Sequence, residues 1–253
     1  MSFTKFMDLV AFDRCFFSSV ANLQKEDPLE GRFPEVLEFL LNGGATRLTG
    51  VVDGWARALA DNLPKVVPLI DETWEYASPF GAVEISPKFT TRELLGVQAN
   101  WIDIICWHTA DVESMAMWKI YGGNEPSVCL VSTIDQFCRS IRLPETSAMV
   151  IGKVEYEDLR DGFGNIHDTF TPYFLKSRHY AYEHELRAIV FNSDDEWQKD
   201  RSALGCHIPV DLSNLISQVI LSPNSPDWFL DLVTKLVSAK VEVDIKRSDV
   251  GVR

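Results

Sequence analysis

Apolar residues along the chain follow helical spacing in some stretches and strand spacing in others. Helical spacing runs from Phe3 to Phe12, and a short apolar strand is expected at Cys15 to Ser18. Proline starts and glycine stops then predict three helices, over Pro34 to Leu41, Trp55 to Leu63 and Pro64 to Tyr76. The first third of the chain is therefore expected to be mainly helical.

The rest of the chain predicts strands that alternate with short helices. Strands are expected at Trp101–Trp107, Ser127–Val131, Ala148–Tyr156, Tyr180–Phe191, His207–Val210, Val219–Leu221 and Val241–Val243, and helices at Asp111–Tyr121, Ile134–Ile141, Asp168–Leu175 and Trp228–Leu236. This order predicts an α+β fold, with a mixed, mainly antiparallel sheet and a helical N-terminal portion. Because neither a repeat nor a low-complexity linker occurs, one continuous domain over 1–253 is expected.

Composition and charge narrow the classes of function. Of the 253 residues, 46% are apolar, and 24 Lys and Arg against 37 Asp and Glu give a net charge of −13. Such a field repels phosphate backbones and anionic lipid, which argues against nonspecific nucleic-acid binding and against membrane binding. No apolar run approaches the ~18 residues of a membrane helix. The chain is expected to be a cytoplasmic enzyme or binding protein.

The cysteines and histidines do not predict a metal site. The five cysteines are an odd number and widely spaced, which is typical of reduced thiols, and neither C-x-x-C nor H-E-x-x-H occurs. Cys106 and His108 share a strand face and could form half of a metal or thiol site, but two core residues are the favoured interpretation. P-loop, dinucleotide-fold and G-x-S-x-G signatures are also missing.

One candidate segment is a strand end followed directly by a helix. His108 lies where the apolar strand turns polar, so it could orient a ligand, although a structural histidine is an equal alternative. On the helix, Ser114, Trp118 and Tyr121 lie at i, i+4 and i+7 and so share one stripe. They could contact a docked ligand, with ordinary core packing of Trp118 as the alternative.

The second candidate segment carries charge of both signs. If 180–191 is a strand, alternation places Glu183, Glu185 and Arg187 on one face, with the two carboxylates about 6.5 to 7 Å apart along the strand. Their repulsion can raise one pKa, while Arg187 pairs with Glu185. Lys176 and Arg178 lie just before them. Acid–base chemistry in a cleft is one interpretation, and a solvated strand face with one salt bridge is the other.

These residues resemble an uncharacterised bacterial family, domain of unknown function 2971, over most of the chain. The resemblance is carried by Asp27-Pro28-Leu29-Glu30-Gly31, Cys106-Trp107-His108 with Glu113-Ser114, Met117 to Tyr121, Ser132-Thr133, Tyr182 to Arg187, Asp211-Leu212, Leu215-Ile216, Pro223 and Asp227-Trp228-Phe229. The resemblance implies the fold of that family and carries no activity.

A more distant similarity is to the ADP-ribosyltransferases, which hold NAD with an Arg strand, a Ser-Thr-Ser strand and a Glu-x-Glu strand. Ser132-Thr133 and Glu183-His184-Glu185 occur here in that order, whereas the third serine is replaced by Ile134. The similarity implies that Glu185 stabilises the ribosyl cation and that Glu183 orients the acceptor. The His-Tyr-Glu pattern of the same superfamily gives an alternative alignment through His108, Tyr121 and Glu185.

Three functions follow from these observations. The first is an ADP-ribosyltransferase-like enzyme that uses NAD, in bacterial defence or as a toxin, with a protein acceptor. The second is a non-catalytic module that binds a small-molecule ligand or a protein partner. The third is a metal-assisted hydrolase or nuclease in which the paired glutamates hold Mg²⁺. In the first, the two candidate segments border one cleft, and activity depends on Glu185.

Overall fold

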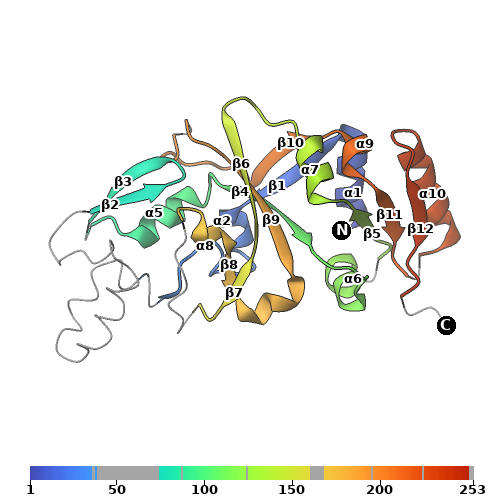
Figure 1. Ribbon diagram of the computed structural model, residues 1–253, viewed down its shortest axis with the longest axis horizontal. Coiled ribbons are helices and arrows are strands. Elements are labelled where there is room, and N and C mark those ends of the chain that lie inside the picture. The colour runs from blue at the N-terminus through green and yellow to red at the C-terminus, as the bar shows by residue number, and fades with distance from the viewer. Residues whose placement is uncertain are drawn as a thin grey trace. The chain divides into compact units, whose positions relative to one another are not determined.

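The computed structural model describes residues 1–35, 38, 74–86, 88–123, 125–159, 168–194, 196–223 and 225–250 (Figure 1). These residues form an α+β fold in which antiparallel strand pairs predominate, as the sequence predicts. They group into two compact units, each built from separate stretches of the chain. The expectation of one continuous domain stays a prediction. The predicted helix at 55–63, and nearly all of the one at 34–41, fall outside the described residues.

The first unit comprises Met1–Phe17, Thr109–Glu145 and His207–Arg253. Its sheet has the order β12-β11-β5, in which β11 is parallel to β12 and antiparallel to β5. The rings of Phe3 and Phe229 pack edge to face, 5.2 Å apart, which joins the first helix to the last. The elements are α1 (Phe3–Phe12), α6 (Met115–Gly122), β5 (Val128–Val131), α7 (Ile134–Ser140), α9 (Leu212–Leu215), β11 (Gln218–Leu221), α10 (Asp227–Ser238) and β12 (Asp244–Arg247).

The second unit comprises Ser18–His108 and Thr146–Cys206. Its strands β4, β9 and β6 belong to a sheet of order β10-β1-β4-β9-β6, and strands β1 and β10 each run across a boundary between the units along the chain. The elements are β1 (Arg14–Ser19), α2 (Val20–Leu23), β2 (Trp74–Ser78), β3 (Gly81–Ile85), α5 (Thr91–Gln98), β4 (Asp103–His108), β6 (Ser147–Lys153), β7 (Glu155–Glu157), α8 (Thr171–Phe174), β8 (Leu175–Ser177), the 3₁₀-helix η2 (Arg178–Glu183), β9 (Glu185–Asn192) and β10 (Gly205–Pro209).

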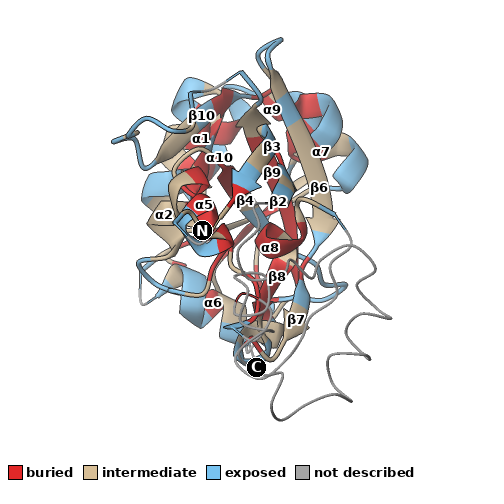
Figure 2. Ribbon diagram, turned by 90° about the vertical axis from the view of Figure 1, so that its left-hand side faces the viewer, coloured by how far each residue is buried: buried red, intermediate tan, exposed pale blue. Residues whose placement is uncertain are grey.

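The core of this second unit lies on one face of β4 and β9. Ile104 and Ile189 are opposite each other in the β4–β9 register and are both buried. The buried residues of α5 and α8, whose ribbon is red in Figure 2, belong to the same unit. The cluster consists of Val20, Phe33, Leu95, Ala99, Ile102, Ile104, Tyr173 and Ile189. Apolar burial of this size is the main favourable term in the folding of the unit.

Several predicted helices are confirmed because their caps lie next to them in sequence. Helix α1 covers Phe3–Phe12 as predicted, after Ser2 as N-cap. Helix α7 begins behind a capping box in which Thr133 and Gln136 bond each other's backbone. Helix α6 begins later than predicted, at Met115, because the cap is Ser114 and not Asp111. Side-chain oxygens at these caps satisfy backbone N–H groups that the helix leaves unpaired.

Some predicted elements are wrong in part, among them the strand at 241–243, because β12 begins only at Asp244. Of the helix predicted at 64–76, residues 64–73 lie outside the described residues, and 74–76 belong to strand β2, which pairs with β3 as an antiparallel hairpin. The predicted strand at 180–191 begins only at Glu185, because 178–183 forms η2. His184 lies between them with a φ of 42°, a left-handed conformation that breaks the alternation of an extended strand.

Gly31 provides a test of how the loop before the core is fixed. Its φ is +67°, and an added Cβ would lie 2.5 Å from Cγ1 of Val20. We expect Gly31→Ala to lower the free energy of unfolding by at least about 2 kcal/mol, from backbone strain and overpacking together. Gly96→Ala in α5 is the control, because nothing lies within 4 Å of its added Cβ and helical alanine stabilises by up to ~1 kcal/mol. Urea unfolding measures both, and equal effects would contradict the strain.

Candidate functional site

Strand β9 is buried on both faces where it carries charge. Leu186, Ala188 and Val190 are buried, which confirms the expectation for them. The opposite face carries Glu185, Arg187 and the core residue Ile189, so the charged side chains lie on the core face. The interpretation of this face as a solvated surface is therefore wrong. Buried charges of this kind need partners, because removing them from water is costly.

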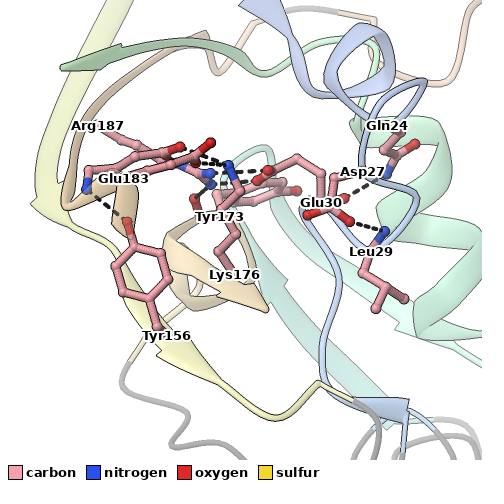
Figure 3. A network of polar contacts seen from close by, with 10 residues as sticks. Gln24, Asp27, Leu29, Glu30, Tyr156, Tyr173, Lys176, Glu183 and Arg187 are labelled. Atoms are coloured by element: carbon pink, nitrogen blue, oxygen red, sulfur yellow. Dashed lines mark hydrogen bonds and ion pairs between the residues drawn. The ribbon is translucent and has the colours of Figure 1, made fainter. Parts of the chain in front are cut away.

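Five buried side chains form what we call the ion network, namely those of Glu30, Lys176, Glu183, Glu185 and Arg187 (Figure 3). Arg187 is at its centre: Nη1 and Nη2 donate to the two carboxylate oxygens of Glu30 at 2.5 and 3.0 Å, and Nε donates to Glu185 at 2.6 Å. Nη1 also donates to the carbonyl of Tyr173 at 2.8 Å. The exposed fractions of the network residues are 0% for Arg187, 3% for Glu30, 5% for Glu185, 7% for Glu183 and 8% for Lys176.

Lys176 from β8 joins the two glutamates of the predicted Glu-x-Glu pattern. Its Nζ donates to Glu183 at 2.5 Å and to Glu185 at 2.7 Å, and it lies 4.7 Å from the centre of the Tyr180 ring. The two carboxylates therefore meet at one ammonium instead of standing apart along a strand. Because its hydrogens point to two carboxylates and an aromatic face, Lys176 positions the glutamates and has little capacity for a ligand.

Glu30 is the network residue that sequence reasoning missed as a site residue. Its loop is held locally: Asp27 accepts from the backbone N–H of Leu29 at 3.1 Å, and Gln24 donates to the carbonyl of Glu30 at 2.8 Å. The left-handed Gly31 follows directly. An Asp-Pro turn closed by a glycine indicates such a loop. Its partner Arg187, however, lies 157 residues away in sequence. A local sequence pattern therefore does not reveal this ion pair.

Glu183 is positioned by its backbone as well as by Lys176. His108, at the end of β4, has Nδ1 2.5 Å from the carbonyl oxygen of Glu183. A carbonyl only accepts, so Nδ1 carries the proton and Nε2 is the remaining nitrogen of the ring. The backbone N–H of Glu185 donates to the hydroxyl of Tyr156 at 2.8 Å. Tyr156 was also missed, since a tyrosine within a short strand carries no signal of this contact.

The environment separates the acidities of the two glutamates. Burial and the hydrogen bond to Glu185 raise the pKa of Glu183 to about 7, against the opposing effect of Lys176. Burial also raises the pKa of Glu185, but three effects outweigh it and lower that pKa to about 2: the charge of Arg187, the hydrogen bond from Glu183, and the charge and hydrogen bond of Lys176. At neutral pH the pair therefore holds a dissociable proton on Glu183 beside an ionised Glu185.

Two exposed residues border the network on β4. Cys106 lies opposite Arg187 in the register, His108 lies opposite Glu185, and both are exposed to solvent. Directly opposed residues share a sheet face. Protein atoms nevertheless surround the thiol closely, and burial raises the pKa of Cys106 to about 12.

The other residues that the sequence predicts to bind a ligand form local contacts outside the ion network. Arg178 is exposed and pairs with Asp158 at 2.9 Å, outside the ion network. Ser114 and Thr133 are N-caps, of α6 and α7, and the hydroxyl of Ser132 donates to the carbonyl of Thr133 at 3.3 Å. In addition, Nε1 of the buried Trp118 donates to Glu113 at 3.0 Å.

Ser114, Trp118, Tyr121, Ser132 and Thr133 all belong to the first unit, whereas the ion network belongs to the second. Tyr121 is exposed, at the end of α6. That this helix and the network border one cleft therefore stays a prediction.

No family model, curated protein or solved structure matches this chain. The resemblances to domain of unknown function 2971 and to ADP-ribosyltransferases thus rest on the quoted residues alone. Among the helices that the structure describes, none is long and apolar enough to cross a membrane. In the same part of the chain, no group of three or more His, Cys, Asp or Glu side chains is arranged to hold a metal ion.

The shared proton predicts a pH-dependent stability. Folding raises the pKa of Glu183 from 4.5 to about 7, so its contribution to stability is complete below pH 4.5 and is lost as the pH rises through 7. The loss is roughly 3 kcal/mol. Glu183→Gln stays neutral at every pH, so its urea midpoint should fall less than that of wild type between pH 5 and 8. The exposed Glu26→Gln should behave as wild type, and parallel curves for wild type and Glu183→Gln would refute the assignment.

The environment of Cys106 predicts an unreactive but accessible thiol. At pH 8 a pKa of about 12 leaves about one thiol in ten thousand as thiolate, although each such thiolate is more nucleophilic. Alkylation of Cys106 by iodoacetamide should therefore be at least ~30-fold slower than that of a small free thiol. Mass spectrometry of the labelled peptides measures the rate, with the exposed Cys138 as a labelling control. A rate equal to that of the free thiol would contradict the prediction.

Proposed function

We propose that this protein is an enzyme that transfers the ADP-ribosyl group of NAD to an acceptor, with the Glu183–Glu185 pair as its acid–base centre. The observation that carries the proposal is that two buried carboxyl groups share one lysine. Their surroundings drive the two pKa values apart, to about 7 for Glu183 and about 2 for Glu185. Two titratable groups whose environments drive their pKa values apart are typical of an acid–base site.

In the proposed reaction the bond between nicotinamide and C1 of the ribose breaks, and nicotinamide leaves with the bonding electrons. The ribosyl centre gains positive charge in the transition state, and the ionised Glu185 stabilises it through the field of its carboxylate. Both oxygens of Glu185 already accept hydrogen bonds, from Arg187 and Lys176. Its contribution is therefore electrostatic and fixed before the substrate arrives.

Glu183 is the group proposed to exchange a proton. A carboxylate with a pKa of about 7 is partly ionised at neutral pH and can accept the proton of the attacking acceptor. His108, exposed beside it with Nδ1 bonded to the Glu183 carbonyl, would present Nε2 to the ligand. NAD is then the small-molecule substrate, and a protein is the acceptor suggested by the resemblance.

A second candidate function is a binding module without turnover. It is favoured by a specific observation. Nε, Nη1 and Nη2 of Arg187 and Nζ of Lys176 all donate hydrogen bonds to oxygen atoms of the protein itself. In this alternative the ion network fixes the shape of the unit, and the exposed edge at Cys106 and His108 contacts the ligand. Thermal shift with NAD, ADP-ribose and Mg²⁺ in turn distinguishes the candidates when it is combined with a turnover assay.

Substitution of the two glutamates tests the proposed enzyme. Glu185→Gln removes the charge and keeps the size, so release of nicotinamide from NAD should fall by at least ~100-fold, the usual size of one lost electrostatic contact. Glu183→Gln should impair transfer to an acceptor more than hydrolysis of NAD. Nicotinamide release is measured with and without cell lysate as acceptor, and circular dichroism verifies folding.

Glu26→Gln, exposed on the loop before the network, is the matched control and should keep wild-type turnover. If wild type binds NAD without releasing nicotinamide, the binding module replaces the enzyme. If wild type neither binds NAD nor cleaves it, the use of NAD is wrong. Full activity of Glu185→Gln would place the reaction elsewhere.

A further inference from the structure

The ion network contains more carboxylates than cations. Three carboxylates, from Glu30, Glu183 and Glu185, meet two cations, from Lys176 and Arg187. All five residues are less than a tenth exposed. An unbalanced charge in such surroundings is costly, and a titratable group removes it by binding a proton. The network therefore has one carboxylate too many for full ionisation.

The geometry distinguishes the three carboxylates. Glu30 holds Arg187 by two parallel hydrogen bonds, the strongest arrangement for this pair. Glu185 accepts from both cations, one on each oxygen. Glu183 contacts Lys176 alone among the cations, so it is the carboxylate with the least compensation. A proton added to the network is best placed on Glu183.

We propose that Glu30 is a positioning residue: by neutralising Arg187 through Nη1 and Nη2, it holds one proton on the Glu183–Glu185 pair. Without the charge of Glu30, two carboxylates would face two cations, and the proton would no longer be needed. Glu30 itself lies on a loop outside the Glu-x-Glu pattern and needs no contact with a substrate. Its effect on the pair passes through Arg187 and Lys176.

Other titratable groups face the network from each neighbouring element and remain unchanged in the test. The charge of Glu183 affects the pKa values of Tyr156 and Tyr180, and the charges of the network affect the pKa of Cys106. His108 bonds the Glu183 carbonyl, and the His184 ring lies 5.9 Å from that of His108. Asp27 faces Tyr180. Because only Glu30 and Arg187 are altered, a change in the titration of Glu183 reports on their charges.

Counting charges predicts opposite effects for single substitutions and cancellation in the double one. Glu30→Gln leaves two carboxylates with two cations, so Glu183 should ionise at a pH lower by about one unit or more, a tenfold fall in proton affinity. Arg187→Met leaves three carboxylates with one cation, so Glu183 should ionise at a higher pH by a similar amount. The double variant restores an excess of one and should titrate within about half a unit of wild type.

The titration of Glu183 is measured by NMR of ¹³C-labelled glutamate carboxyl groups in the full chain, without substrate. Glu183→Gln assigns the signal, and Glu26→Gln is the control. An unmoved midpoint in Glu30→Gln, or shifts of one sign in both single variants, overturns the inference. If Glu30→Gln does not fold, the double variant, which removes the buried pair together, is compared with Arg187→Met, from which it differs only in the charge of Glu30: its midpoint should be lower by about one unit or more, and equal midpoints contradict the charge count. If Arg187→Met does not fold, Glu30→Gln decides alone.

The role of this inference in catalysis rests on the proposed function, but the experiment distinguishes a failure of the positioning role from a failure of the proposed function. If NAD is the substrate, the pH profile of nicotinamide release should move with the NMR midpoint in Glu30→Gln, whereas a merely structural role would lower activity at every pH. If the midpoints shift as expected and no variant cleaves NAD at any pH, the positioning role of Glu30 stands and the proposed function fails. If NAD is cleaved and the midpoints do not move, the positioning role fails alone.

Discussion

The guanidinium of Arg187 is fully buried on the face of β9 that also forms the core of the second unit. Taking a cation out of water costs several kcal/mol even after the protein relaxes, and Arg187 cannot escape that cost by losing its proton. Carboxylates must therefore come to it. Glu185 is supplied from the same strand, two residues away, and Glu30 is supplied from a distant loop. The loop, the strand and the helix before β8 are thus arranged around one charge.

This arrangement also explains why the network includes Lys176 and Glu183. A carboxylate that serves Arg187 with one oxygen has a second oxygen to satisfy, and for Glu185 this role falls to Lys176. Lys176 then brings Glu183 to the same point, which η2 and the left-handed His184 make possible. Strain at a non-glycine residue of about 1–3 kcal/mol persists only where surrounding contacts hold it. Here the carbonyl of Glu183, bonded by His108, supplies such a contact.

Elements determined by nearby residues could be predicted from the sequence, and elements determined by distant partners could not. Phe3–Phe12 and the strand at 128–131 follow from local periodicity and caps. The turn at Ser78 to Gly81 carries proline and glycine signals, which could have revealed the β2–β3 hairpin. The strand predicted over 180–184 failed because alternation of residue types cannot show that Lys176 draws Glu183 out of an extended path. Glu30 was missed for the same reason, since charge pairing over such a separation leaves no local pattern.

The candidate site shows the same division, and it changes what the glutamate pair can do. Sequence reasoning grouped Glu183, Glu185 and Arg187 on one strand face, either in a cleft or on a solvated surface, and the structure brings their side chains together in a buried network. Their burial alters the chemistry, because in water neither carboxylate would hold a proton at neutral pH. The same desolvation that makes Arg187 demand two carboxylates raises the pKa of the third, on Glu183. A proton available near pH 7 is therefore a consequence of how the core of this unit balances its charges, and stability and proton transfer must change together when that balance is altered.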